Sequence, residues 1–345
     1  MGALAKYYSA EKYVYLLLLF TAAVIPVNQV FTLLMVAVTF IAGLTVAVKY
    51  RKIKHVPVLP RVQQGLLFLL LGITWYSLRF SADSAVSAYN FGYVVGQYVL
   101  FVWVMLRYGG DGRLDFDWHK PKEWPRPLQI LSVLLAAGFF NSLYGIYQHF
   151  TGVVPTDPWV DPSQFPELKT RVVGTLINPN IFAGYLVLLL SFALPFIKIT
   201  SGKIRAFLLA LAAVLGISLI YTFSRGNWVA CACALGFYFL FFWRKWLLPL
   251  AVCAAGGIYL MHGAVWHRLI SIFGTQDTSV ALRFAYLKST LFIIEEHPYG
   301  VGWYGFQYIY PEYDSIRRRV LETGRSYQEI YQKAVEEAWK KRKND

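Results

Sequence analysis

Residues 186–196 read Leu-Val-Leu-Leu-Leu-Ser-Phe-Ala-Leu-Pro-Phe and contain no charged side chain. Residues 65–76, Gly-Leu-Leu-Phe-Leu-Leu-Leu-Gly-Ile-Thr-Trp-Tyr, have the same character, and similar runs recur along a 345-residue chain that is 57% hydrophobic and only 15% charged. Continuous apolar runs are typical of membrane-spanning helices, whereas the strands of a membrane barrel are shorter and alternate polar with apolar residues. The sequence therefore predicts an all-α integral membrane protein.

Polar links divide the apolar sequence into segments of a length suited to crossing a bilayer, whose hydrocarbon core needs about 20 residues per helix. About nine transmembrane helices are predicted, over residues 13–26, 28–48, 62–79, 85–106, 128–150, 180–197, 206–222, 227–243 and 246–262.

The first two spans are predicted to form a hairpin that turns at Pro26 and Asn28. Lys6 and Lys12 precede this region and four basic residues follow it within 49–54, so both of its ends lie on one side of the membrane. An even number of crossings is then required. The basic start resembles a signal peptide, but it has no convincing small-residue cleavage site.

The distribution of Lys and Arg gives the orientation. With a cytoplasmic N-terminus, the predicted inner segments hold seventeen basic residues and the outer links hold four, which are Arg79, Lys169, Arg171 and Arg225. This excess follows the positive-inside rule. The net charge of +14 is thus mostly a topology signal, helped by attraction to anionic membrane lipid, and does not indicate nucleic-acid binding.

Two domains follow from this topology. Residues 1–262 are the predicted transmembrane domain, and residues 263–345 are a predicted extracytoplasmic segment. Within the second domain the pattern predicts a helix over 279–296, a glycine-rich turn over 300–305 and a helical tail over 314–343.

Several familiar chemistries lack support in the sequence. Cys231, Cys233 and Cys253 fall inside predicted spans and are interpreted as small buried hydrophobic residues, so neither a metal site nor a cofactor is expected. Residues 300–305 fit the Gly-x-Gly-x-x-Gly pattern, but no strand precedes them, which argues against a dinucleotide site.

The predicted outer face combines arginines with helix starts. Asn178 is placed to cap the sixth span, with Pro179 at its first helical position, and Ser224 lies at the start of the eighth. Both spans run inward, so their N-terminal amides face outward close to Arg171 and Arg225. Guanidinium groups beside helix N-termini suit an anion, above all phosphate.

Arg283 is a third candidate. It lies near the start of the predicted helix 279–296, where a positive charge opposes the helix dipole, which suggests another role for this side chain. The alternative for each arginine is that it reaches toward lipid headgroups at the membrane boundary.

Three stretches together resemble a known family. They are Arg171-Val-Val-Gly-Thr-Leu-Ile-Asn-Pro-Asn-Ile-Phe-Ala-Gly184, then Thr222-Phe-Ser-Arg-Gly-Asn-Trp228, then Leu282-Arg283 followed by His297-Pro-Tyr-Gly-Val-Gly-Trp-Tyr-Gly-Phe306. In order and spacing, over roughly residues 60 to 310, this set resembles the O-antigen ligase and polymerase family of bacterial membrane proteins.

The resemblance implies a function and a location. The chain would have a glycosyltransferase-C-like architecture in the bacterial inner membrane and would transfer a glycan from a polyprenyl-diphosphate carrier, such as undecaprenyl diphosphate, without a metal. The acceptor would be lipid A core, a growing polysaccharide or a protein. The residues implied to bind the lipid diphosphate are Arg171, Arg225 and Arg283, together with Asn178, Asn180 and Ser224.

The C-terminal region departs from the family pattern. Family members usually carry a loop histidine that serves as general base, followed by further spans, and neither follows Tyr313 here. The catalytic residue therefore stays unknown, with His297 interpreted as structural. The sequence leaves two expectations open: a shortened family member with impaired transfer, or a chain whose helical tail binds a partner protein.

A second function remains possible from the sequence, namely a transport or transport-accessory protein, for example in inorganic-carbon handling. Its polar residues within spans are Asn90, Gln97, Asn141, Gln148 and His149, but no carboxylate or lysine lies at mid-depth. Cation-coupled transport is therefore disfavoured.

Overall fold

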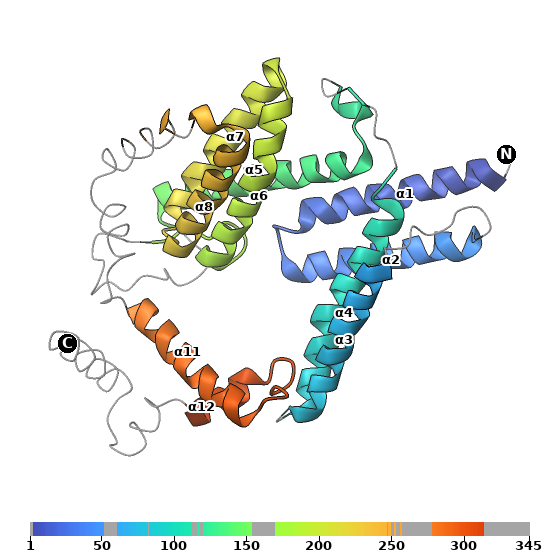
Figure 1. Cartoon of the computed structure of the whole chain (residues 1–345). Coiled ribbons are helices and arrows are strands. Elements are labelled where there is room, and N and C mark those ends of the chain that lie inside the picture. Colours follow the sequence, from blue (N-terminus) through green and yellow to red (C-terminus); the bar gives the residue numbers. More distant parts are fainter. Residues whose placement is uncertain are drawn as a thin grey trace. The chain divides into compact units, whose positions relative to one another are not determined.

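In a computed structural model the described part of the chain is almost entirely helical (Figure 1). The structure describes residues 3–51, 61–81, 83–111, 116–117, 120–153, 170–246, 248–249, 252, 256 and 278–313, and these contain no strand. The helices are α1 (Ala3–Val24), α2 (Gln29–Lys49), α3 (Arg61–Ser77), α4 (Ser84–Tyr108), α5 (Arg126–Thr151), α6 (Pro179–Ile199), α7 (Gly202–Tyr221), α8 (Arg225–Phe242), α11 (Thr278–Glu296) and α12 (Phe306–Tyr313). Short 3₁₀ turns cover Leu78–Phe80, Pro121–Glu123 and Arg244–Trp246.

Six of these helices, α2 and α4 to α8, are long and apolar enough to cross a membrane. In α4 and α8 only 6% of the most apolar stretch is buried inside the protein. Apolar faces of that size are unfavourable in water and fit contact with lipid. The all-α membrane fold is confirmed, while nine crossings remain a prediction, because α1 and α3 are not among the six and residues 246–262 lie almost entirely outside the described part.

Contacts group the chain into two compact units. The first consists of Met1–Pro57 and Leu100–Ile272, and the second of Val58–Val99 and Phe273–Asp345. Within the second unit Phe80 stacks on Tyr299 with ring centroids 5.4 Å apart, and a Cβ added to Gly302 would lie 2.4 Å from the Cβ of Ser81. Residues 58–99 thus group with residues 273–345, while the division at residue 262 into a transmembrane domain and an extracytoplasmic segment stays a prediction.

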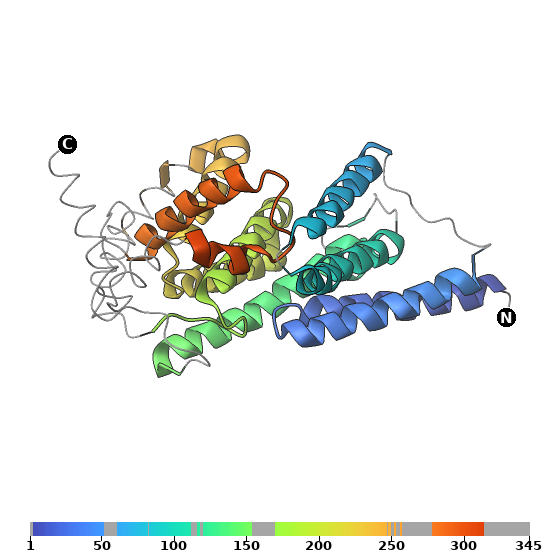
Figure 2. The same ribbon diagram turned by 90° about the horizontal axis from the view of Figure 1, so that it is seen from below.

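The predicted N-terminal hairpin is present in the first unit, where α1 and α2 lie side by side (Figure 2). Asn28 caps α2, its Oδ1 accepting from the amide of Phe31 at 3.1 Å. Thr21 and Thr39 join the two helices through their hydroxyl groups, 2.9 Å apart. A hydrogen bond between short side chains suits an apolar surrounding, because water does not compete for it.

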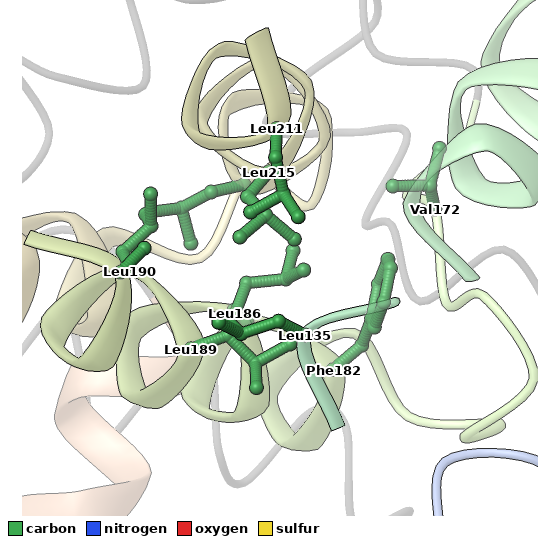
Figure 3. Close-up of a cluster of buried hydrophobic side chains, with 11 residues drawn as sticks. Leu135, Val172, Phe182, Leu186, Leu189, Leu190, Leu211 and Leu215 are labelled. Carbon is green, nitrogen blue, oxygen red and sulfur yellow. The ribbon is translucent and has the colours of Figure 1, made fainter. Parts of the chain in front are cut away.

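The main core of the first unit lies between α5, α6 and α7 (Figure 3). Phe182 and Leu186 of α6 are fully buried against Leu215 of α7. Two glycines of α5 permit the close approach. A Cβ added to Gly138 would lie 2.0 Å from Leu189, and a Cβ added to Gly145 would lie 2.8 Å from the Ser218 hydroxyl. Small residues at helix contacts are typical of membrane bundles. This packing holds the starts of α6 and α8 at one end.

Candidate anion site

The link between α7 and α8 is a tight reversal that places the start of α8 beside the end of α7. Phe223 has a left-handed backbone with φ 50° and is buried, so the turn is held by packing although the residue is not glycine. Trp228 of α8 reaches back and donates from its indole nitrogen to the carbonyl of Leu219 at 3.0 Å. The reversal therefore has a fixed geometry.

The segment before α6 is a buried loop whose backbone is bonded by side chains of α5. Gln148 accepts from the amides of Val173 at 3.1 Å and Gly174 at 2.9 Å, and it donates to the carbonyl of Gly174 at 2.9 Å. Asn141 accepts from the amide of Thr175 at 3.0 Å. Buried backbone groups need hydrogen-bond partners, so the side-chain amides of Gln148 and Asn141 fix the shape of the loop.

Arg171 lies at the start of this loop and is 93% buried, with 7% of its surface exposed. Its Nε donates to the carbonyl of Thr222 at 2.8 Å, and its Nη2 donates to Oδ1 of Asn180 at 2.9 Å. A guanidinium keeps its charge when it is buried. These bonds fix a positive charge between the end of α7 and the start of α6.

Asn180 connects three elements. Its Oδ1 also accepts from the hydroxyl of Ser224 at 2.8 Å, and its backbone carbonyl accepts from the side-chain amide of Asn227 at 3.1 Å. Asn227 in turn donates to the Ser224 hydroxyl at 2.9 Å. We call Arg171, Asn180, Ser224 and Asn227 the polar node, and it joins the starts of α6 and α8 as the sequence expects.

The two helix starts differ in a way the sequence does not show. Asn178 caps α6, as predicted, and its Oδ1 accepts from the amides of Asn180 at 2.8 Å and Ile181 at 3.3 Å. At α8, Ser224 makes no side-chain hydrogen bond to the helix amides; its hydroxyl donates to Asn180 and accepts from Asn227. Of the two, the α8 start is therefore better suited to receive an anion.

The remaining predicted arginines occupy different places. Arg225 is the first residue of α8, directly after the polar node, and is half-buried. Arg283 is exposed on α11, which belongs to the second compact unit. The structure thus brings Arg171, Asn180 and Ser224 into one network with Arg225 next in sequence, while Arg283 as a ligand of the same anion remains a prediction.

Sequence reasoning did not select Thr222, Asn227 or the two amides of α5 for this region. Asn227 was detectable, because it lies in the quoted Thr222 to Trp228 stretch. The role of Thr222 was not detectable, because its backbone carbonyl, and not its side chain, makes the contact with Arg171. Asn141 and Gln148 stood out only as polar residues inside a span.

Other groups considered from the sequence have the following surroundings. The hydroxyl of Tyr313 donates to the carboxylate of Glu296 and lies 3.5 Å from Nε2 of His297. Cys233 is exposed on α8, which corrects the expectation that it is buried; because α8 is apolar and little covered, this small side chain suits lipid as well as a core. The described residues contain no group of three or more potential metal ligands. Cys253, residues 263–277 and the tail 314–343 lie outside the described part.

A family model described as O-antigen ligase matches residues 206–328. Over this region the chain is similar to O-antigen ligases. The matched region begins within α7 and contains the α8 start with Ser224 and Arg225, as well as Arg283, whereas Arg171, Asn178 and Asn180 precede it. No curated protein and no solved structure matches the chain. This match supports a general role of the chain in glycan transfer during polysaccharide or lipopolysaccharide assembly.

Proposed function

We propose that this chain binds a polyprenyl-diphosphate-linked glycan at the outer face of the bacterial cytoplasmic membrane and transfers the glycan to an acceptor. The observation that carries the proposal is the start of α8, where Ser224 gives the first amides no side-chain cap and Arg225 is the first helical residue. Backbone amides and a guanidinium together match the oxygens of a diphosphate.

The two arginines of this region have different roles in the proposal. Arg225 is half-buried and contacts the diphosphate directly. Arg171 is buried and bonded to Thr222 and Asn180, so it supplies positive charge from behind the α8 start and fixes the helix positions. Arg283 is the third cation, by its place in the quoted motif set.

The chemistry follows from where charge develops. When the bond between the anomeric carbon and the diphosphate oxygen breaks, its electron pair goes to the diphosphate, and an acceptor hydroxyl forms the new bond and loses a proton. The cations and amides stabilise the leaving diphosphate more strongly in the transition state than in the bound donor. Lipid A core, a growing polysaccharide and a protein are all acceptors that fit this scheme.

The polar residues of α5 favour transfer over transport. Gln148 and Asn141 bond the backbone of residues 173–175, and neither amide is arranged as a solute site. A transporter is expected to direct such groups toward a central pathway. The structure gives no specific support to the transport alternative.

The test measures donor binding and glycan transfer separately, using full-length protein in vesicles that contain an undecaprenyl-diphosphate-linked glycan. We expect Arg225→Ala to weaken both, while Arg205→Ala, at an exposed position near the start of α7, leaves both unchanged. Donor binding without transfer in the wild type would indicate that the general base comes from elsewhere. Donor binding that does not respond to Arg225→Ala would remove the proposed site.

A further inference from the structure

A groove of about 340 Å³ lies at the other end of the α5, α6 and α7 bundle. Its walls are almost wholly apolar and include Leu135 and Ala136 of α5, Phe196 of α6, and Phe207 and Leu208 of α7. All of these belong to the first compact unit. The groove lies next to the main core, because Leu135 is part of both.

The depth of the groove in the membrane follows from the elements that line it. Trp124 precedes α5 and Lys203 is the second residue of α7, so this end lies where the sequence predicts the cytoplasmic surface. Tryptophan and lysine are typical of the headgroup level. From Lys203 to Leu211 the lining rises along α7 by roughly 12 Å at 1.5 Å per residue, which reaches well into the hydrocarbon layer.

An apolar space of this depth suits an acyl chain. A water molecule in the groove would find few polar partners. One of these partners, the Ser132 hydroxyl, already donates its proton to the carbonyl of Leu128 at 2.7 Å. Trp124 and Phe196, with ring centroids 5.8 Å apart, provide a broad apolar wall. Burial of methylene groups against such walls is favourable.

The charge at the mouth of the groove selects the headgroup. Lys203 is exposed there, and in the described part of the chain it makes no hydrogen bond or ion pair. Lys198 of α6 and Arg205 of α7 lie near it in the sequence, and residues 198–205 contain no acidic side chain. Lys198 lies over the ring of Phe242, 4.8 Å from its centroid, so Lys203 is the cation best placed to contact a headgroup.

We propose that this groove binds one anionic glycerophospholipid of the cytoplasmic leaflet, with an acyl chain along α5 and α7 and the headgroup phosphate at Lys203. The lipid fills the space between the lower parts of these helices and stabilises the bundle that carries the polar node at its other end. This binding does not depend on the proposed glycan transfer.

Two pairs of variants test the proposal in the full chain. Ala136→Phe fills the groove from its exposed wall, and Ala206→Phe adds the same side chain to α7 about 130° around the helix from the centre of the lining residues. Lys203→Glu reverses the charge at the mouth, and Arg205→Glu makes the same change in α7 at a residue that does not line the groove.

The measurement is native mass spectrometry of purified, delipidated protein after addition of phosphatidylglycerol or phosphatidylethanolamine. We expect one tightly held phosphatidylglycerol per chain, lost in Ala136→Phe and kept in Ala206→Phe. Lys203→Glu should weaken phosphatidylglycerol binding at least about five-fold, because a lysine near an anionic lipid surface contributes about 1 kcal/mol, and Arg205→Glu should have a smaller effect.

Circular dichroism and thermal melting show whether each variant keeps its helices, and Lys203→Glu, a surface change, remains informative if Ala136→Phe does not fold. Equal retention of phosphatidylglycerol in Ala136→Phe and Ala206→Phe would overturn the proposal. So would equal affinity for both lipids, or loss of a dimer instead of a lipid in Ala136→Phe, which would make the groove an interface between copies.

Discussion

Arg171 donates from Nη2 to Oδ1 of Asn180 at 2.9 Å, and the same oxygen accepts from the Ser224 hydroxyl at 2.8 Å. One amide oxygen thus connects a buried cation, the start of α6 and the start of α8. Because both donors need this acceptor, the orientation of the Asn180 amide is fixed. The Ser224 hydroxyl belongs to this network and gives α8 no side-chain cap.

Substitution of Asn180 separates stability from donor binding. Asn180→Ala leaves Arg171 and Ser224 without this acceptor and should destabilise the fold by about 1–3 kcal/mol, seen as a lower melting temperature. Asn180→Asp keeps an acceptor and adds a carboxylate beside Arg171, so the fold should remain stable. Its negative charge should nevertheless weaken binding of the lipid diphosphate. Donor affinity in Asn180→Asp equal to that of the wild type would contradict the proposed anion site.

Arg225 should be required for transfer more than for folding. Loss of one positioned donor to a developing anion commonly reduces a rate about 100-fold or more, and we expect a loss of that size in Arg225→Ala, with a partial loss in Arg225→Lys because an ammonium cannot make a bidentate contact. Initial rates of glycan transfer in vesicles measure this, with Arg205→Ala as the control. A melting temperature that falls as steeply as the rate would instead indicate a structural role.

Gly174 should tolerate no side chain. Its φ is +56°, and an added Cβ would lie 2.4 Å from Oδ1 of Asn141. Gly174→Ala therefore displaces the amide that bonds Thr175 and should lower the free energy of unfolding by roughly 1–3 kcal/mol. Gly216→Ala in α7 is the matched control, since nothing lies within 4 Å of its added Cβ. That change should be neutral or slightly stabilising. Similar melting temperatures for the two variants would show that the loop rearranges freely.

The orientation can be tested on described residues with single cysteines. In a variant with the three natural cysteines replaced by serine, Val153→Cys should react with an impermeant maleimide added outside cells, and Ser201→Cys should react only after the membrane is opened. Both positions are exposed. The opposite pattern would place the polar node on the cytoplasmic side and would exclude an extracytoplasmic donor.

The sequence by itself determined the membrane fold, the positions of α2 to α8 within about four residues, and the cap at Asn178, whereas α1 begins at Ala3, well before the predicted span 13–26. These features depend on local composition: long uncharged runs require lipid, and an Asn-Pro pair at the start of such a run favours a helix start. The resemblance also grouped Arg171, Asn180 and Ser224, which the structure joins by hydrogen bonds, with Asn178, Arg225 and Arg283. Binding of a lipid diphosphate by this set stays a prediction.

Only the tertiary structure decided how these residues divide their roles. The sequence treats the starts of α6 and α8 alike, but the fold directs the Ser224 hydroxyl to Asn180, and Ser224 makes no side-chain bond to the amides of its own helix. Likewise, Gln148 becomes a bonding partner of the loop before α6 only because α5 packs against it, 25 residues away in sequence. Hydrogen bonds between distant segments depend on packing, and residue spacing alone does not encode them.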